Sequence, residues 1–83
     1  MARILLFASI KDRAGTGQID VPLPGPTPLR GVLAMAASAA GIEEGLLSRG
    51  CALFAVNHET VALDHLVNDG DEVALLPPMS GGR

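Results

Sequence analysis

Arg3 to Ile10 reads RILLFASI, and this bulky apolar run decides how the rest of the chain is expected to fold. Both alternation phases of the run are apolar, which suits a strand buried on both faces of a sheet, or covered by a partner on one face. We therefore expect a central strand over residues 3–10. The two phases are Ile4, Leu6 and Ala8 on one side, and Leu5 and Phe7 on the other.

A hairpin follows this strand. Lys11 to Gly17 (KDRAGTG) is polar and contains glycine, as loops do. Gln18 to Leu23 (QIDVPL) then alternates apolar and polar residues, the pattern of a strand with one buried face. Pro22 marks this second strand as an edge strand, because proline cannot donate to a strand ladder.

The second half of the chain contains three more strand-like stretches: residues 51–56 (CALFAV), residues 60–63, and residues 72–76 (EVALL). Asn57-His58-Glu59 is expected to turn the chain, residues 64–67 to form an irregular crossover, and Asn68-Asp69-Gly70-Asp71 a tight turn of residues that tolerate positive φ. Pro77-Pro78 ends the last strand.

One amphipathic helix is predicted between the second and third strands. Thr27 followed by Pro28 is typical of a helix N-cap and a first helical position. The apolar positions that follow share one stripe: Leu29, Val32, Leu33, Ala36 and Ala40. Gly41 is a natural stop, since helices often end in a residue with positive φ. Residues 42–50 are a loop or one short further turn of helix.

This order of elements predicts the fold class. Strand, strand, helix and three strands in 83 residues leave room for one domain with one sheet. We expect an α+β, β-grasp (ubiquitin-like) domain over residues 1–78, with a mixed five-stranded sheet and one main helix across one face. Residues 79–83 are left as a flexible C-terminal tail that carries Gly-Gly.

A single helix leaves the other face of the sheet open. If Ile4, Leu6 and Ala8 face the helix, Leu5 and Phe7 lie on the uncovered face with Val73 or Leu75. Such an apolar patch indicates a protein-docking surface, with Phe7 and Leu75 as its expected anchors. The alternative is an apolar sheet face without a partner, because single exposed apolar residues are common.

Composition excludes several classes of partner. The net charge of −3, with six Lys and Arg spread along the chain, provides no basic face for nucleic acid. The apolar stretch at residues 29–40 is too short to span a membrane. Cys51 is the single cysteine and no signal peptide is visible, so we expect a cytoplasmic protein without disulfides. Cys51 is either a small buried hydrophobe or a persulfide carrier. His58 and His65 fit no zinc motif, and no metal site is expected.

Three pieces of the sequence together resemble a known family. They are RILLFAS leading into KDRAG (residues 3–15), Ala55-Val56-Asn57, and the closing DGDEVALLPPMSGG (residues 69–82). The chain is similar over nearly its whole length to the molybdopterin synthase small-subunit family, the MoaD-like branch of the MoaD/ThiS sulfur carriers. The closing piece is the most specific. Thiamin-pathway carriers share the fold and the Gly-Gly end but usually lack the Pro-Pro approach, and a carrier of that type is the second alternative within this class.

The resemblance implies chemistry at the tail. In such carriers the C-terminal carboxylate, here that of Gly82, attacks ATP to form an acyl-adenylate, and sulfur then displaces AMP to leave a thiocarboxylate. Gly81 and Gly82 suit a narrow passage because they lack Cβ. Pro77 and Pro78 stiffen the base of the tail, and Met79 and Ser80 complete the segment that enters a partner. The chain is not expected to be catalytic alone or to bind a cofactor; ATP is used by the activating enzyme.

The resemblance also implies the partners. These are the large subunit of molybdopterin synthase, which binds the cyclic pyranopterin precursor, and an adenylating enzyme of the ubiquitin-activating type. The departure from the family is Arg83, since the family normally ends at Gly-Gly. Three interpretations are open: a protease removes Arg83, the arginine was left by cloning, or this member has another role. Trimming by a processing protease is the preferred interpretation.

Two other functional classes remain open. A ubiquitin-like modifier would use the same Gly-Gly to form an isopeptide bond with lysines of other proteins. A pure binding domain would use no tail chemistry, and deletion of Gly81 and Gly82 would then leave its function intact.

Overall fold

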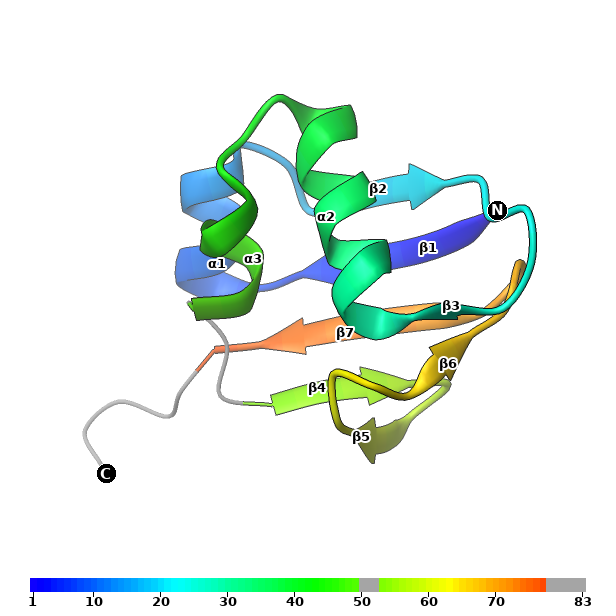
Figure 1. The fold of residues 1–83 in the computed structure, drawn as a ribbon. Coiled ribbons are helices and arrows are strands. Elements are labelled where there is room, and N and C mark those ends of the chain that lie inside the picture. The colour runs from blue at the N-terminus through cyan, green and yellow to red at the C-terminus, as the bar shows by residue number, and fades with distance from the viewer. Residues whose placement is uncertain (50–52, 78–83) are drawn as a thin grey trace.

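Five strands form one mixed sheet in the computed structural model, which describes residues 1–49 and 53–77 (Figure 1). The sheet order is β2-β1-β7-β4-β5. β1 and β7 are parallel, and the other neighbouring pairs are antiparallel. The bounds are β1 Ala2–Leu6, β2 Gln18–Val21, β4 Leu53–Val56, β5 Glu59–Val61 and β7 Glu72–Leu76. The predicted β-grasp architecture is confirmed, with β2 at an edge as Pro22 indicated.

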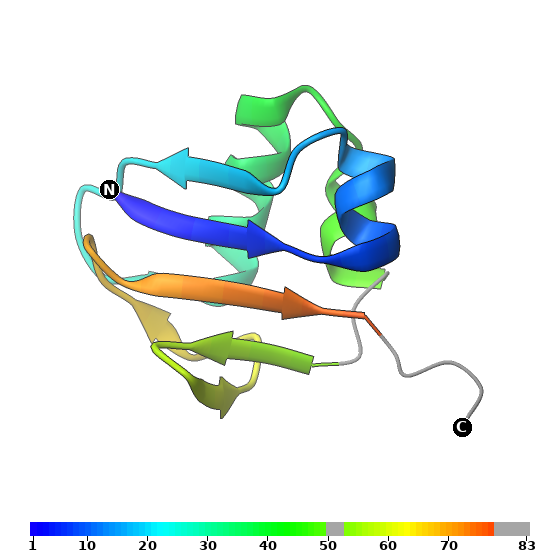
Figure 2. The same cartoon turned by 180° about the vertical axis from the view of Figure 1, so that it is seen from behind.

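The helices lie on one side of this sheet. The main helix α2, Leu29–Ala40, runs across one face, as predicted. The shorter helices α1, Ala8–Ala14, and α3, Glu44–Arg49, lie at the end of the sheet where β1 and β7 end (Figures 1 and 2). For residues 42–50 the sequence left two alternatives, a loop or a short further turn of helix, and α3 confirms the second.

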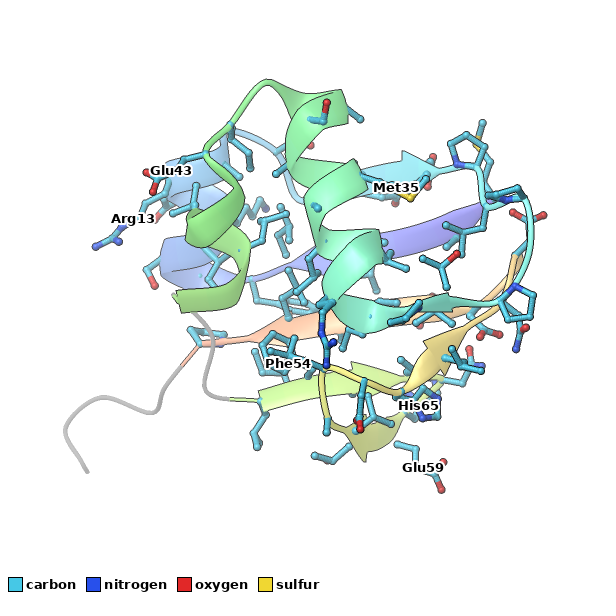
Figure 3. All side chains as sticks on the ribbon, in the orientation of Figure 1. Arg13, Met35, Glu43, Phe54, Glu59 and His65 are labelled. Atoms are coloured by element: carbon cyan, nitrogen blue, oxygen red, sulfur yellow. The ribbon has the colours of Figure 1, made fainter. Side chains whose placement is uncertain are left out.

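The core fills the space between α2 and the sheet. Its largest fully buried side chains are Ile4, Leu6, Ile10, Val21, Leu29, Val32, Leu33, Leu47, Val67, Val73 and Leu75. Met35 and Phe54 pack against this cluster from its margin on the helix side (Figure 3). Among the described residues no polar or charged side chain is buried. The domain is therefore held together by apolar burial and backbone hydrogen bonds.

The prediction of one strand from Arg3 to Ile10 is wrong beyond Leu6. The chain turns at Phe7 and Ala8, where Ala8 has a φ of 49°, and enters α1. The turn of the helix brings Ile10 into the core at 1% exposure, so the apolar residue that suggested a longer strand is buried by a helix instead. The predicted loop at residues 11–17 is accordingly half helix. Ala8, expected to face the helix from the strand, is an exposed residue of α1.

The start of α2 also differs from the prediction. Thr27 and Pro28 form a short strand, β3, which pairs with β6, Leu66–Val67, in a separate two-stranded sheet. Thr27 Oγ1 donates to the carbonyl of Gly25 at 2.9 Å, and no side chain caps the helix. The N-cap prediction for Thr27 is therefore wrong. The irregular crossover is confirmed at residues 64–65 and wrong at residues 66–67, which form β6. The end of α2 is confirmed, because Gly41 has a φ of 71°.

Candidate functional site

The face of the sheet that no helix covers has a middle row in which Leu5 is followed by the small residues Ala74, Ala55 and Thr60. Strand register places Leu5 beside Ala74, and Ala74 beside Ala55. The row continues on β5, where Ala55 pairs with Thr60. Because alternate residues of a strand share a face, Phe7, Leu76 and Leu53 lie one step nearer the end of β7 on this same face. Figure 2 shows the open face, with α2 behind it and α1 at the end of the sheet.

These small residues leave a hollow of about 360 Å³ on the open face. It is lined by Leu5, Phe7, Ala55, His58, Thr60, Glu72, Ala74 and Leu76. Ala55 is buried and forms part of the floor, whereas Phe7 is 43% exposed. Leu53, which pairs with Leu76 and is 49% exposed, continues the apolar surface beyond the hollow. A depression of this size suits apolar side chains from a protein partner.

Leu75 was predicted to anchor this face, and that prediction is wrong. Leu75 is fully buried in the core, as is Val73, the other candidate. Ala74 and Leu76 occupy the open face in their place, because Leu5 pairs with Ala74 rather than with Leu75. The prediction that Leu5 and Phe7 lie on the uncovered face is confirmed. Ala55, His58, Glu72, Ala74 and Leu76 were not foreseen there; strand pairing, which the sequence pattern alone does not specify, would have identified them.

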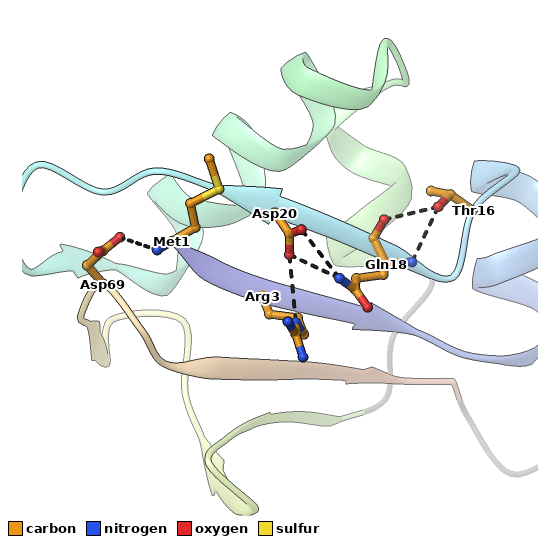
Figure 4. A network of polar contacts seen from close by, with 6 residues as sticks. All are labelled: Met1, Arg3, Thr16, Gln18, Asp20 and Asp69. Atoms are coloured by element: carbon orange, nitrogen blue, oxygen red, sulfur yellow. Dashed lines mark hydrogen bonds and ion pairs between the residues drawn. The ribbon is translucent and has the colours of Figure 1, made fainter.

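The opposite end of the open face is polar. Arg3 Nε lies 3.8 Å from Asp20 Oδ1, and Gln18 Nε2 donates to both carboxylate oxygens of Asp20 at 3.2 and 3.3 Å. Figure 4 shows these side chains side by side on β1 and β2. The face thus changes from charged at the start of β1 and β7 to apolar at their ends.

The apolar end of the face is also the base of the tail. Leu76 is the last residue of β7, and the half-buried Pro77 follows it. The tail residues singled out in the sequence, Pro78, Met79, Ser80, Gly81, Gly82 and Arg83, lie outside the described residues, as does Cys51. Phe7 and Leu76 therefore place the hollow directly beside the point where the tail begins.

A tight turn forms the polar wall of the hollow. Asn57 and His58 connect β4 to β5, and both have positive φ, at 51° and 72°. The Asn57 side chain ties this turn to β7: Asn57 Nδ2 donates to Asp71 Oδ1 at 3.0 Å, and its Oδ1 accepts from the Glu72 backbone N–H at 3.0 Å. His58 Nε2 lies 3.9 Å from Glu72 Oε1. His58 and Glu72 are consequently held beside each other at the rim.

One perturbed carboxylate lies at the start of β1, away from the hollow. The Met1 ammonium, 3.1 Å from Asp69 Oδ1, and a hydrogen bond from the Leu23 backbone N–H at 3.3 Å hold the pKa of Asp69 below its ordinary value of 3.8. Both contacts favour the charged carboxylate. They join the start of β1 to the turn before β7, so this ion pair stabilises the fold and takes no part in the docking face.

Neither a metal site nor a membrane span is found in the part of the chain that the structure describes. Within residues 1–49 and 53–77, no group of three or more His, Cys, Asp and Glu residues is arranged to hold a metal ion. No helix in those ranges is long and apolar enough to cross a membrane.

A β-grasp sheet with one open apolar face, and a chain end that leaves from a central strand, defines a ubiquitin-like protein. A model of the ThiS family matches residues 4–82, and the chain belongs to that family. The predicted membership of the MoaD/ThiS sulfur carriers is confirmed.

Three relatives show where the likeness lies. The molybdopterin synthase sulfur carrier subunit of Escherichia coli is 38% identical over 86 aligned positions, covering 99% of this chain and all of that protein. SAMP1 of Haloferax volcanii superposes with a TM-score of 0.80 at 29% identity, with 98% of each chain covered. A complex of subunits 1 and 2 of the molybdopterin-converting factor of Helicobacter pylori contains a chain with a TM-score of 0.64 and 25% identity, covering 98% of this chain and 97% of that one.

Proposed function

We propose that this protein is the sulfur carrier subunit of a molybdopterin synthase. The observation that carries the proposal is its likeness over the full length to the Escherichia coli subunit of that name. The geometry supports it, because an apolar hollow lies at the base of a tail that contains Gly81-Gly82. A carrier needs both features: a surface that docks on an enzyme, and a thin chain end that reaches the enzyme's active site.

The tail chemistry proceeds in two steps. A carboxylate oxygen of Gly82 attacks the α-phosphorus of ATP, and pyrophosphate leaves to give an acyl-adenylate. Hydrosulfide then attacks the carbonyl carbon; the new C–S bond replaces the C–O bond to AMP, and a proton is lost to solvent. Both steps belong to an adenylating enzyme, so this chain supplies the acyl group and no catalytic residue. ATP must be present in the compartment, and we place the carrier in the cytoplasm.

Activation requires a free carboxylate on Gly82, but Arg83 follows it in the chain. One extra residue moves the carboxylate about 3.3–3.6 Å further out and adds a long cationic side chain to the tip. We propose that a protease hydrolyses the Gly82–Arg83 peptide bond before activation.

Docking of the carrier uses the open sheet face. Phe7 and Leu76 flank the base of the tail, so a protein bound over them receives the tail in a defined direction. The Helicobacter pylori complex pairs subunit 1 of the molybdopterin-converting factor with subunit 2, and by analogy the partner here is a molybdopterin synthase large subunit. The adenylating enzyme would bind the same face at a different time.

Intact mass of the protein isolated from its own cells tests this function. The expected result is loss of arginine, with a fraction about 16 Da heavier, the difference between sulfur and oxygen. A chain that carries unmodified Arg83 throughout, under conditions where molybdenum enzymes are being made, would contradict the carrier function.

A protein modifier is the second candidate, because SAMP1, a small archaeal modifier protein by name, superposes on this chain with a TM-score of 0.80. The two functions share activation of Gly82 and differ in the acceptor. A modifier forms an amide with a lysine of another protein, whereas a carrier is captured by sulfide. Branched peptides in which a lysine of another protein is joined by an amide bond to the segment of this chain that ends in Gly82 would favour the modifier.

A further inference from the structure

The turn between β4 and β5 carries backbone strain at the docking face. A two-residue hairpin turn in which both residues have positive φ is the type that favours Asn-Gly, because glycine adopts the second conformation without steric cost. Asn57 fits the first position. His58 occupies the second with a φ of 72°, where a β-carbon is disfavoured.

Strain of this kind marks a position where the side chain does something that glycine cannot. The His58 side chain is 90% exposed, so packing in the core does not account for a histidine at this position. It does line the hollow beside Leu5, Ala55 and Ala74. Its Nε2 lies 3.9 Å from the carboxylate of Glu72, whose side chain is 40% exposed.

The backbone around this pair is fixed. Asn57 N–H donates to the Glu72 carbonyl at 2.8 Å, and the Glu72 N–H donates to Asn57 Oδ1 at 3.0 Å. The two hydrogen bonds set the spacing between the hairpin turn and β7. The backbone positions of His58 and Glu72 are therefore set before a partner binds, and only their side chains have to be ordered on binding.

We propose that His58 is a specificity-determining residue of the docking face, and that with Glu72 it receives an arginine or lysine of the molybdopterin synthase large subunit. This inference rests on the proposed function. Charge complementarity supports a cationic group, because Glu72 is the acidic residue among those lining the hollow and the chain has a net charge of −3. Arg3, the strand partner of Glu72, contacts Asp20 instead, with Nε 3.8 Å from Oδ1. An apolar side chain of the same partner would fill the hollow over Ala55 and Ala74.

Replacement of His58 by glycine separates this role from a structural one. His58→Gly removes the strain and the contact together, so stability and binding are expected to change in opposite directions. The melting temperature should rise by about 2–5 °C, since relief of the left-handed conformation outweighs the added freedom of the unfolded chain. The dissociation constant for the large subunit should rise about tenfold, the effect of losing one polar contact to a charged group.

Two further variants complete the experiment. His58→Asn retains a residue that tolerates positive φ but lacks the imidazole, and it should weaken binding similarly without extra turn flexibility. Glu59→Ala is the matched control: it removes a neighbouring carboxylate that points away from the open face, and binding should be unchanged (Figure 3).

The measurement is titration calorimetry of the full chain against the purified large subunit. Weaker binding by both His58 variants, with His58→Gly more stable than the parent, supports the proposal. If the parent chain binds and both His58 variants bind with the same dissociation constant, the role of His58 is overturned and the carrier function is unaffected. Failure of the parent chain to bind the large subunit overturns both.

Discussion

Leu75 and Leu76 are neighbours in β7 with opposite environments, because successive side chains of a strand point to opposite faces. Leu75 is fully buried in the core, whereas Leu76 lines the hollow. Leu75→Ala should lower the free energy of unfolding by about 2–5 kcal/mol through lost burial and the cavity left behind. Leu76→Ala should change it by less than about 1 kcal/mol while weakening docking. Urea denaturation of both variants is the measurement, and equal losses would refute the assignment of faces.

Asp69 should make stability depend on pH. Its pKa is lowered in the folded chain, so the unfolded chain binds more protons as the solution is acidified. The stabilisation is therefore present above the ordinary value of 3.8 and is lost as pH falls from there through the lower folded pKa. Asp69→Asn should be less stable than the parent at pH 7, and the difference should vanish near pH 2. Thermal melts of both proteins across this pH range test the prediction. A stability difference that stays constant with pH would rule out the Asp69 ion pair as the cause of the difference.

Among the structural elements, the end of α2 depends on the backbone of one glycine. Gly41 has a φ of 71°, and a β-carbon added there would have no atom within 4 Å, so an added methyl group meets strain and no clash. Gly41→Ala should cost about 1 kcal/mol. Gly25 has equal space without positive φ, and Gly25→Ala should be neutral or stabilising by about 0.4–1 kcal/mol. Equal melting temperatures for the two variants would contradict the role of the left-handed conformation.

The elements that the sequence predicted well are those with a long periodic signal. α2 and β7 lie at the predicted positions, because a helix-length apolar stripe and a strand between a tight turn and Pro-Pro leave few alternatives. α1 was missed because a helix of seven residues owes its stability to packing, here of Ile10 in the core, and not to its own sequence. β3 and β6 are two residues each and depend on tertiary pairing.

The docking face was predicted only in part for a related reason. β1 and β7 are apolar in both alternation phases. The pattern therefore shows that both faces of the sheet carry apolar side chains, but not which residues of β1 lie on the same face as which residues of β7. Phe7 was placed correctly because the phase of β1 could be related to the helix. Leu75 was placed wrongly because its phase depends on the pairing of Leu5 with Ala74 across the parallel strands.

Over the whole molecule, the apolar end of the open face and the ion pairs of Asp69 and Arg3 lie at different ends of the sheet. The N-terminus lies at the end of the sheet where Asp69 and Arg3 make their charged contacts, and the chain leaves β7 at the other end (Figures 1 and 4). The hollow extends along β7 from Glu72, near the first end, to Leu76 at the second end, where the tail begins. A protein bound over the hollow therefore also covers Leu76, the last residue of β7, and leaves the hollow no room for a second enzyme.

Under the proposed function, this arrangement predicts that an adenylating enzyme and a large subunit compete for the chain. Adding the large subunit should raise the apparent KM for carrier in ATP–pyrophosphate exchange without changing the maximal rate. Phe7→Ala, which removes the aromatic anchor, should weaken binding to both enzymes by at least about 2 kcal/mol, roughly thirtyfold. Ser38→Ala, an exposed change on α2 across the sheet, should affect neither. A ternary complex that still supports exchange at the original KM would show that the two enzymes bind different faces of the chain. Only one of them would then bind over the hollow.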